Sequence, residues 1–196
     1  LNDQAELFRE KGRYDEAEPL YKQALAIFAK ARGFDHPSVA LALTDLAELY
    51  TLQSRYDEAE PLYQRALVIW KKAVGPHHPD IVQSLNSLAN LYSVQGRYAE
   101  AEPLYKRAIA IFEKSLGANH PSVASALDNL ASVYKAEARY AEAEPLYRTA
   151  LAIREKSLGP DHPDVARSLN NLADLYQTRG DSAKAEAVRR SIVAVI

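Results

Sequence analysis

The sequence contains no cysteine and no methionine, and only seven of its 196 residues are glycine. Without cysteine the chain forms no disulfide, thiolate zinc site, iron–sulfur cluster or cysteine nucleophile, although either redox compartment stays open. Seven glycines and ten prolines exclude collagen-like and low-complexity classes. No apolar run approaches the roughly 20 residues that span a bilayer.

The chain also lacks an excess of charge of either sign. It has 24 Lys and Arg against 26 Asp and Glu, which gives a formal net charge of -2. Nucleic acids and anionic membrane surfaces attract basic proteins, so we expect neither as a partner. The first residues, Leu1-Asn2-Asp3-Gln4, form neither a basic nor an apolar region of a signal peptide. These features favour a soluble protein with a cytoplasmic location.

One segment recurs at a fixed distance along the chain. Residues 55–63, Arg-Tyr-Asp-Glu-Ala-Glu-Pro-Leu-Tyr, have counterparts every 42 residues without insertion, as does a His-Pro dipeptide. The period is marked by Tyr14, Tyr56, Tyr98 and Tyr140, and by the dipeptides at 36–37, 78–79, 120–121 and 162–163. A repeat of this length is the signature of a stacked array. We therefore predict one array over 1–196, with units at 1–36, truncated at its start, then 37–78, 79–120, 121–162 and 163–196.

Each unit has the pattern of two helices. Apolar residues fall at spacings of three and four, a glycine follows the second helix, where a left-handed residue closes its last turn, and the Pro of His-Pro opens the next first helix. First helices are predicted near 1–11, 37–53, 79–95, 121–137 and 163–179. Second helices are predicted near 14–32, 56–74, 98–116, 140–158 and 182–195, the last of them a solvent-facing cap.

Small and aromatic residues also alternate in register with the repeat. Alanines such as Ala47, Ala59 and Ala66 permit close helix crossings, and Tyr50 and Tyr63 with their repeats fill the spaces between helix pairs. A position on the second helix holds Phe28, Trp70 and Phe112, which indicates packing between units. Arg154 breaks this series, and we expect local exposure there.

These residues resemble a known family. Leu43-x2-Leu46-Ala47-x2-Tyr50 followed by Ala59-x3-Tyr63 is similar to the tetratricopeptide repeat, with Leu, Ala and Tyr at the usual Trp, Gly and Phe positions. The 42-residue period, longer than the usual 34, and the Leu-Gly-Pro-Asp-His-Pro-Asp-Val connection at 158–165 resemble the kinesin light chain repeat. The resemblance covers the whole chain. It implies an all-α, right-handed superhelical solenoid of five helix-turn-helix units with ten helices.

The resemblance also implies a binding groove, because first helices line the concave side of such arrays. On these helices the face opposite the core is rich in Asn, Gln, Ser and Thr. The expected groove residues are Asn2, Arg9, Thr44, Glu48, Gln83, Asn86, Asn90, Asp128, Lys135, Arg167, Asn170 and Asp174. In the kinesin light chain family the first Asn of Leu-Asn-Asn-Leu-Ala contacts cargo peptide; Asn2, Asn86 and Asn170 match that position, whereas Thr44 and Asp128 do not. Tetratricopeptide domains that bind chaperones clamp the C-terminal carboxylate with a set of basic and Asn residues. That set is absent from the first three units, which disfavours binding of a chaperone tail.

Other patterns are better explained structurally. The His-Pro histidines are too far apart in successive units to share one metal ion, so we interpret them as cap and loop residues. The paired carboxylates at Glu16-x-Glu18 and Glu58-x-Glu60 suit the positive end of a helix rather than acid–base catalysis. No nucleophile and base stand out together and no Gly-rich phosphate loop is present. We expect no catalytic residue, cofactor or metal.

The sequence thus predicts a non-catalytic scaffold that binds a peptide or partner segment along its first helices. Two alternatives stay open. In one, the array is a spacer or assembly arm that acts through its ends, and the apolar run Ile192-Val-Ala-Val-Ile196 mediates self-association. In the other, the chain is the regulatory portion of a larger enzyme or signalling protein.

Overall fold

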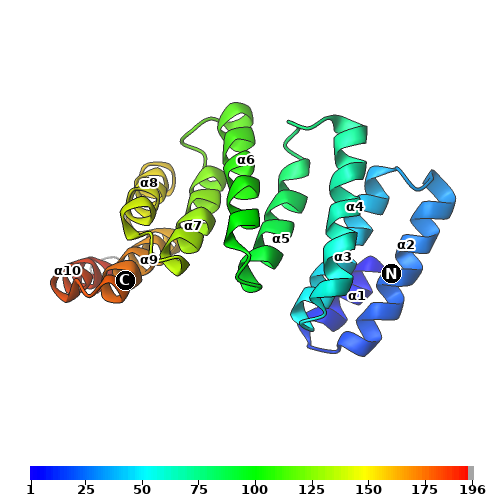
Figure 1. The fold of residues 1–196 in the computed structure, drawn as a ribbon, viewed down its shortest axis with the longest axis horizontal. Helices are drawn as coiled ribbons and strands as arrows, with labels where there is room; N and C mark the ends of the chain where they lie inside the picture. The colour runs from blue at the N-terminus through cyan, green and yellow to red at the C-terminus, as the bar shows by residue number, and fades with distance from the viewer. Residues whose placement is uncertain (194–196) are drawn as a thin grey trace. The chain divides into compact units, whose positions relative to one another are not determined.

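The computed structural model describes the backbone of residues 1–193 and the side chains of residues 1–191. Throughout this part of the chain the regular structure is α-helical, and α1 with α2, α3 with α4, α7 with α8 and α9 with α10 pack as hairpins (Figure 1). The prediction of an all-α solenoid of five helix-turn-helix units is confirmed. The chain divides into two compact units, unit 1 at Leu1–Gln95 and unit 2 at Gly96–Ile196. The apolar run at 192–196, invoked for self-association, has its side chains outside the described part.

The helices fall where the repeat predicts them. Unit 1 contains α1 (Asn2–Glu10), α2 (Tyr14–Arg32), α3 (Pro37–Leu52), α4 (Tyr56–Val74) and α5 (Ile81–Val94). Unit 2 contains α6 (Tyr98–Leu116), α7 (Pro121–Ala136), α8 (Tyr140–Leu158), α9 (Pro163–Arg179) and α10 (Ser182–Val193). The odd-numbered helices are the first helices of their hairpins, and their outward surface in each unit is called the first-helix face below.

The His-Pro dipeptides start first helices. His36, His120 and His162 are N-cap residues, and each Nδ1 accepts a hydrogen bond from the backbone N–H two residues later, at 3.1, 3.2 and 3.1 Å. The following Pro occupies the first turn, where its missing N–H leaves no bond unmade. Their interpretation as cap residues is confirmed. Helix α5 differs and begins at Ile81 rather than 79, because its first backbone bonds span three residues instead of four.

The second helices end at glycines with positive φ, as the sequence suggests, but not in the expected left-handed helical conformation. Gly117 follows α6 with φ of 87° and ψ of 151°. This region is open essentially to glycine alone. It extends the chain away from the helix instead of closing a further turn, which leads the backbone into the His-Pro connection.

The core follows the small-residue pattern. Ala47, Ala59 and Ala66 are completely buried. The tyrosines at the equivalent position of four second helices are buried as well, namely Tyr21, Tyr63, Tyr105 and Tyr147. An alanine at a crossing lets two helices approach closely, while a buried aromatic ring supplies about 1.5–3 kcal/mol of hydrophobic stabilisation. Within each unit, alanine and tyrosine therefore fix the spacing of the hairpins.

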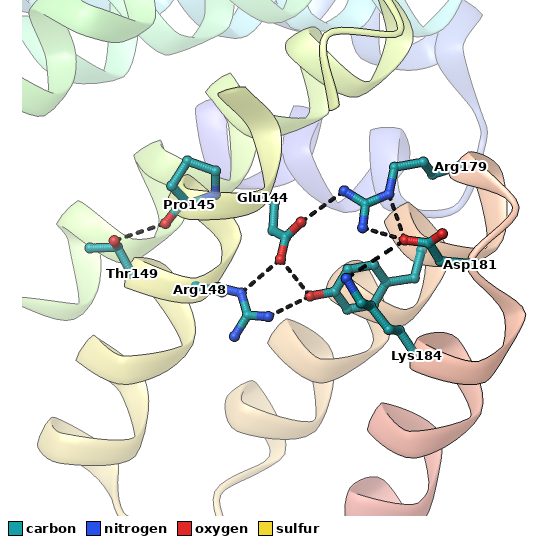
Figure 2. Close-up of polar contacts among 8 residues, drawn as sticks. Glu144, Pro145, Arg148, Thr149, Arg179, Asp181 and Lys184 are labelled. Carbon is teal, nitrogen blue, oxygen red and sulfur yellow. Dashed lines mark hydrogen bonds and ion pairs between the residues drawn. The ribbon is translucent and has the colours of Figure 1, made fainter. Parts of the chain in front are cut away.

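Successive hairpins are also joined by a recurring polar cluster, the glutamate clamp, shown for unit 2 in Figure 2. Glu144 of α8 accepts hydrogen bonds from the Tyr176 hydroxyl at 2.7 Å and from Arg179 at 2.8 Å, both contributed by α9. Arg148 of α8 donates to the same carboxylate at 3.0 Å. Burial acts to raise the pKa of Glu144, but these three donors together lower it to about 2.

The clamp recurs in both units. Glu18 accepts from Tyr50 at 3.1 Å and Arg55 at 2.7 Å in unit 1. Glu102 accepts from Tyr134 at 2.9 Å and Arg139 at 2.8 Å in unit 2. Hydrogen bonding to the arginine is the main reason why the pKa of each glutamate falls to about 2. The second glutamate of each Glu-x-Glu pair therefore has a specific partner in the next hairpin, beyond its place in the first turn of a helix.

Candidate functional site

The first-helix face carries the predicted binding residues with very different degrees of exposure. Five are exposed: Gln83, Asn90, Arg167, Asn170 and Asp174. Five are half-buried: Asn2, Arg9, Glu48, Asn86 and Lys135. Two are buried: Thr44 and Asp128. Ten of the twelve residues thus retain some accessible surface within their own unit.

Thr44 and Asp128 were expected on the exposed stripe, and that expectation is wrong. Only 1% of Thr44 and 7% of Asp128 is exposed. The reason is that this position turns toward the next first helix: the Thr44 hydroxyl lies 3.4 Å from the Ser84 hydroxyl of α5. In unit 2, Asp128 instead accepts a hydrogen bond from the buried Arg154, which also donates to Ser168 of α9. Asn170 occupies the same position of α9 and is exposed.

The charged members of the face pair along it. Arg9 of α1 lies 3.9 Å from Glu48 of α3 in unit 1. In unit 2, Lys135 of α7 forms an ion pair with Asp174 of α9. Both pairs join the same two positions of successive repeats. The two charges of each pair cancel. The net charge of each face is therefore determined by its other charged residues.

Unit 1 has a depression of about 190 Å³ on this face. It is lined by residues of α1, α3, α4 and α5, namely Arg9, Glu48, Thr51, Leu52, Tyr63, Ser87 and Asn90. Burial raises the pKa of Glu48, although Arg9 and a 3.2 Å hydrogen bond from Ser87 oppose the shift. Burial also raises the pKa of Asp45, which accepts a hydrogen bond from Asn2 at 2.6 Å.

Unit 1 is consequently acidic at this face. The carboxylates of Glu6, Asp45 and Glu48 surround the single guanidinium of Arg9, whose closest ion-pair partner is Glu6. Three negative groups against one positive group leave an excess of negative charge. Such a surface favours cationic or hydrogen-bond-donating groups of a ligand.

Unit 2 has a larger depression of about 300 Å³, which is lined only by residues with polar or charged side chains. It lies between α7 and α9, and it is lined by Ser125, Asp128, Asn129, Ser132, Arg154, Arg167 and Asn171. Its floor is a buried ion pair, since Arg154 Nη1 lies 2.6 Å from Asp128 Oδ2. The same nitrogen donates to the Ser168 hydroxyl, and Nη2 donates to Ser125 at 3.3 Å.

The expectation that Arg154 marks local exposure is wrong. Only 1% of the residue is exposed, so the guanidinium replaces an aromatic ring inside the unit. Burial raises the pKa of Asp128, which Arg154 most strongly opposes, followed by Arg167 and Asn171. Asp128 Oδ1 is buried and has no hydrogen-bond partner in the described part of the chain.

Sequence reasoning missed the residues one position further along each first helix. Ser87 lines the depression of unit 1, and Asn129 and Asn171 line that of unit 2. The signal was present, because this position holds only polar residues: Asp3, Asp45, Ser87, Asn129 and Asn171. The exposed face was assigned from the position of each residue relative to the core leucines. That criterion alone does not distinguish two adjacent polar positions on a helix.

Among the described residues, no group of three His, Asp or Glu side chains is placed to hold a metal ion. No described helix combines the length and apolarity required to cross a membrane.

Comparisons with known proteins agree with this architecture. The family model for the tetratricopeptide repeat matches residues 1–72, 39–114, 80–156 and 122–191. No curated protein sequence matches the chain. Repeats of this family generally mediate protein–protein interaction, and the fold is typically a non-catalytic interaction scaffold.

Solved structures narrow the type of repeat. A putative kinesin light chain from Podosopora anserina with nearly identical TPR-like repeats is 30% identical, with a TM-score of 0.86 over 99% of this chain and 92% of that one. BtubC (BKLC) from P. vanneervenii is 28% identical, with a TM-score of 0.85 over 97% and 76%. Rap protein complexed with competence and sporulation factor shares the fold at 19% identity, with a TM-score of 0.78 over 99% and 52%. The chain therefore belongs to the tetratricopeptide repeat family, as an array of the kinesin light chain type.

Proposed function

We propose that the first-helix face of each unit binds an extended peptide or a partner segment. The observation that carries this proposal is that each unit has a depression with polar side chains in its lining on the same face, formed between first helices of successive hairpins. Two units with different side chains thus present a hollow in the same part of the repeat. A merely solvated helix face does not require one.

The lining residues suit recognition of a peptide main chain. Asn90 in the first depression, and Asn129 and Asn171 in the second, each carry an amide that both donates and accepts hydrogen bonds. An amide of this kind pairs with a backbone N–H and C=O without requiring a particular ligand side chain. Because the surface is polar and wet, we expect weak to moderate affinity.

Charge supplies the selection that the amides do not. The unit 1 face has the negative excess of Glu6, Asp45 and Glu48 over Arg9. In the unit 2 depression Arg154 pairs with Asp128, and Arg167 pairs with Asp164 at its edge, so the charges there balance. Basic ligand residues therefore suit the unit 1 face, and neutral residues suit the unit 2 face. The comparisons support interaction with a protein; the peptide mode and the charge preference are our proposal.

The test is selection from a phage-displayed library of random linear peptides against the immobilised 196-residue chain. We expect enriched peptides whose capture falls at least about tenfold when Asn90→Tyr and Asn170→Tyr are combined. Both side chains are exposed on the proposed face, so bulky rings block access without entering the core.

A matched control carries Lys114→Tyr and Lys156→Tyr, which add the same two rings at exposed sites near the ends of the second helices α6 and α8. The control variant should retain peptide capture. Equal capture by both variants, with unchanged helical circular dichroism, would reject the first-helix face as the binding surface.

A further inference from the structure

Unit 1 has a second hollow, which shares no lining residue with the depression of its first-helix face. This second-helix pocket has a volume of about 360 Å³ and lies among the second helices α2 and α4, helix α3 and the connection between α2 and α3. Its volume is within the range of ligand pockets, roughly 300–1,000 Å³. The apolar residues that line it are Leu25, Ala26, Ala29, Phe34, Val39 and Leu43.

The apolar lining of the second-helix pocket is accessible from solvent. Phe34 is 72% exposed, and Ala26 is exposed as well. Ala29 is half-buried, whereas Val39 and Leu43 are buried and close the pocket from below. An exposed aromatic ring beside an apolar hollow is typical of a surface that binds a partner.

The pocket departs from the repeat at two of its lining positions. Where α2 has Ala29, the other long second helices have charged residues, namely Lys71, Glu113 and Glu155. Where the connection has Phe34, the later connections have Pro76, Ala118 and Pro160. The first hairpin thus loses a charge and gains an aromatic ring beside the same hollow. The packing of the repeat does not require either change, because the other units fold without them.

The surroundings of the pocket are basic. The C-terminal halves of α2 and α4, residues 23–32 and 65–74, contain no acidic residue and five basic ones, namely Lys30, Arg32, Arg65, Lys71 and Lys72. The carboxylate of Asp35 is shared between Arg65, at 3.2 Å, and Lys72. Arg32 donates to the neutral hydroxyl of Ser38 at 3.1 Å. Lys22, which also lines the pocket, is offset by Glu18. Positive charge therefore remains in excess.

We propose that the second-helix pocket is a docking site for an acidic segment of a partner protein. One aliphatic or aromatic side chain of this segment enters the pocket against Phe34 and Ala29. The carboxylates beside it in the segment pair with basic residues such as Arg65 and Arg32. A basic segment would meet the excess of positive charge and would be repelled.

This site goes beyond the proposed function, because it lies on another surface and selects the opposite charge. The first-helix face of unit 1 has the negative excess of Glu6, Asp45 and Glu48 and suits basic ligand residues. The two surfaces of unit 1 therefore take different segments, and either can fail without the other.

The experiment is a titration of the isotopically labelled 196-residue chain with defined peptides, followed by nuclear magnetic resonance. The probes are the acetylated and amidated pentapeptides Glu-Asp-Leu-Asp-Glu, Glu-Asp-Gly-Asp-Glu and Lys-Lys-Leu-Lys-Lys. We expect saturable shifts of the Phe34 ring signals and of the Ala29 backbone amide with the acidic leucine peptide. The acidic glycine peptide lacks the apolar side chain and the basic peptide has the wrong charge, so both should bind at least about fivefold more weakly. Raising the salt concentration from about 0.05 to about 0.5 M should weaken the acidic leucine peptide at least about threefold.

Two variants give unit 1 residues that other units already carry, so the fold tolerates them. Phe34→Pro introduces the residue found after Gly75 and Gly159, and Ala29→Glu introduces the residue found in α6 and α8. Each should weaken the acidic leucine peptide at least about fivefold. The control Ala110→Glu adds the same charge at an exposed position of α6 in unit 2 and should bind like the parent chain. The variant with Asn90→Tyr and Asn170→Tyr should also bind it like the parent, which separates this site from the first-helix face.

Other outcomes overturn the proposal. Equal or tighter binding of the basic peptide, or unchanged binding by Phe34→Pro with its helical signal intact, rejects the acidic segment as the occupant. Saturable shifts of the Phe34 ring with decanoate but with none of the peptides assign the pocket to an anionic amphiphile instead. Shifts that depend on the concentration of the chain alone, and that Phe34→Pro abolishes at the Ala29 amide, assign it to a second copy of the chain.

Discussion

Units 1 and 2 differ most sharply at one position of the second helix. Trp70 of α4 occupies it in unit 1 and is 6% exposed, whereas Arg154 of α8 occupies it in unit 2 and is 1% exposed. The first helices that precede them, α3 and α7, have the same bounds relative to the repeat, as do α4 and α8 themselves. A buried aromatic ring and a buried cation are therefore interchangeable in this fold, provided that the neighbours change with them.

The neighbours do change. In unit 1, Thr44 and Ser84 of successive first helices contact each other directly at 3.4 Å. In unit 2 the equivalent residues are Asp128 and Ser168, and both accept hydrogen bonds from Arg154. The weak hydroxyl contact of unit 1 is thus replaced in unit 2 by a buried ion pair, in which Arg154 donates to both residues. The first-helix face and the core of unit 2 are therefore coupled, because the cation that fills the core also forms the floor of the depression.

The largest expected effect comes from breaking that ion pair. Arg154→Phe leaves Asp128 buried without its cation, and we expect the free energy of unfolding of unit 2 to fall by about 3–5 kcal/mol. Urea unfolding followed by circular dichroism and by hydrogen exchange measures the loss. Trp70, the only tryptophan, reports on unit 1 through its fluorescence.

A double variant sharpens the comparison. Arg154→Phe combined with Asp128→Thr gives unit 2 the residue types of unit 1, and we expect the remaining loss to be below about 1.5 kcal/mol. A double variant no more stable than the single one would show that the ion pair is not the reason for the loss.

A smaller effect is expected from the clamp, which both units share. Glu144→Gln removes the charge that joins α8 to α9, and we expect a loss of about 2 kcal/mol. Its control is Glu142→Gln, whose solvent-exposed pair with Arg139 should contribute much less, because water screens it. Glu18→Gln tests the same bond in unit 1. Equal losses from Glu144→Gln and Glu142→Gln would contradict the clamp.

Acid should weaken the clamp with a definite sign. The pKa of Glu18, Glu102 and Glu144 is about 2 in the folded chain against an ordinary value of 4.5. A lowered pKa contributes stability that is fully present above pH 4.5 and is lost as the pH falls toward 2, because the unfolded chain binds the proton first. Between pH 5 and pH 3, Glu144→Gln should therefore lose about 1 kcal/mol less stability than the parent chain. A pH profile identical to the parent would contradict this assignment.

The repeat made most of the fold predictable. The starts of α2, α4, α6 and α8 agree with the sequence pattern to the residue, because tyrosine, glycine and His-Pro recur at fixed positions. Helix α5 was misplaced by two residues because its first turn has a different backbone bonding pattern, which the shared His-Pro motif does not reveal.

The site was less predictable, for a physical reason. Helical spacing places a residue on a face to within about 100° of rotation, and adjacent polar positions such as Asp128 and Asn129 both satisfy it. Which of the two turns inward depends on the neighbouring helices. Ser84 of the next first helix contacts Thr44, whereas Arg154 of the intervening second helix donates to both Asp128 and Ser168. Arg154 was placed in solvent because charge suggested exposure, whereas its partner lies 26 residues away.

The smallest predicted effect tests whether the two units obey the same backbone rules. Gly12, Gly96 and Gly180 have positive φ in the turns between first and second helices, whereas unit 1 also has Ser54 at φ of 59° and unit 2 has Ala138 at φ of 58° in such turns. A residue with a Cβ is strained there, and glycine is not. Ala138→Gly and Ser54→Gly should therefore each raise the free energy of unfolding by about 0.5–1 kcal/mol, since relief of strain exceeds the added entropy of the unfolded chain. Glycine in a helix interior has the opposite effect, so Ala110→Gly, at an exposed position of α6, should lower stability by about 1 kcal/mol. A gain in stability in one unit without a gain in the other would contradict this expectation. The turns would then differ between the units, as the position of Trp70 and Arg154 does.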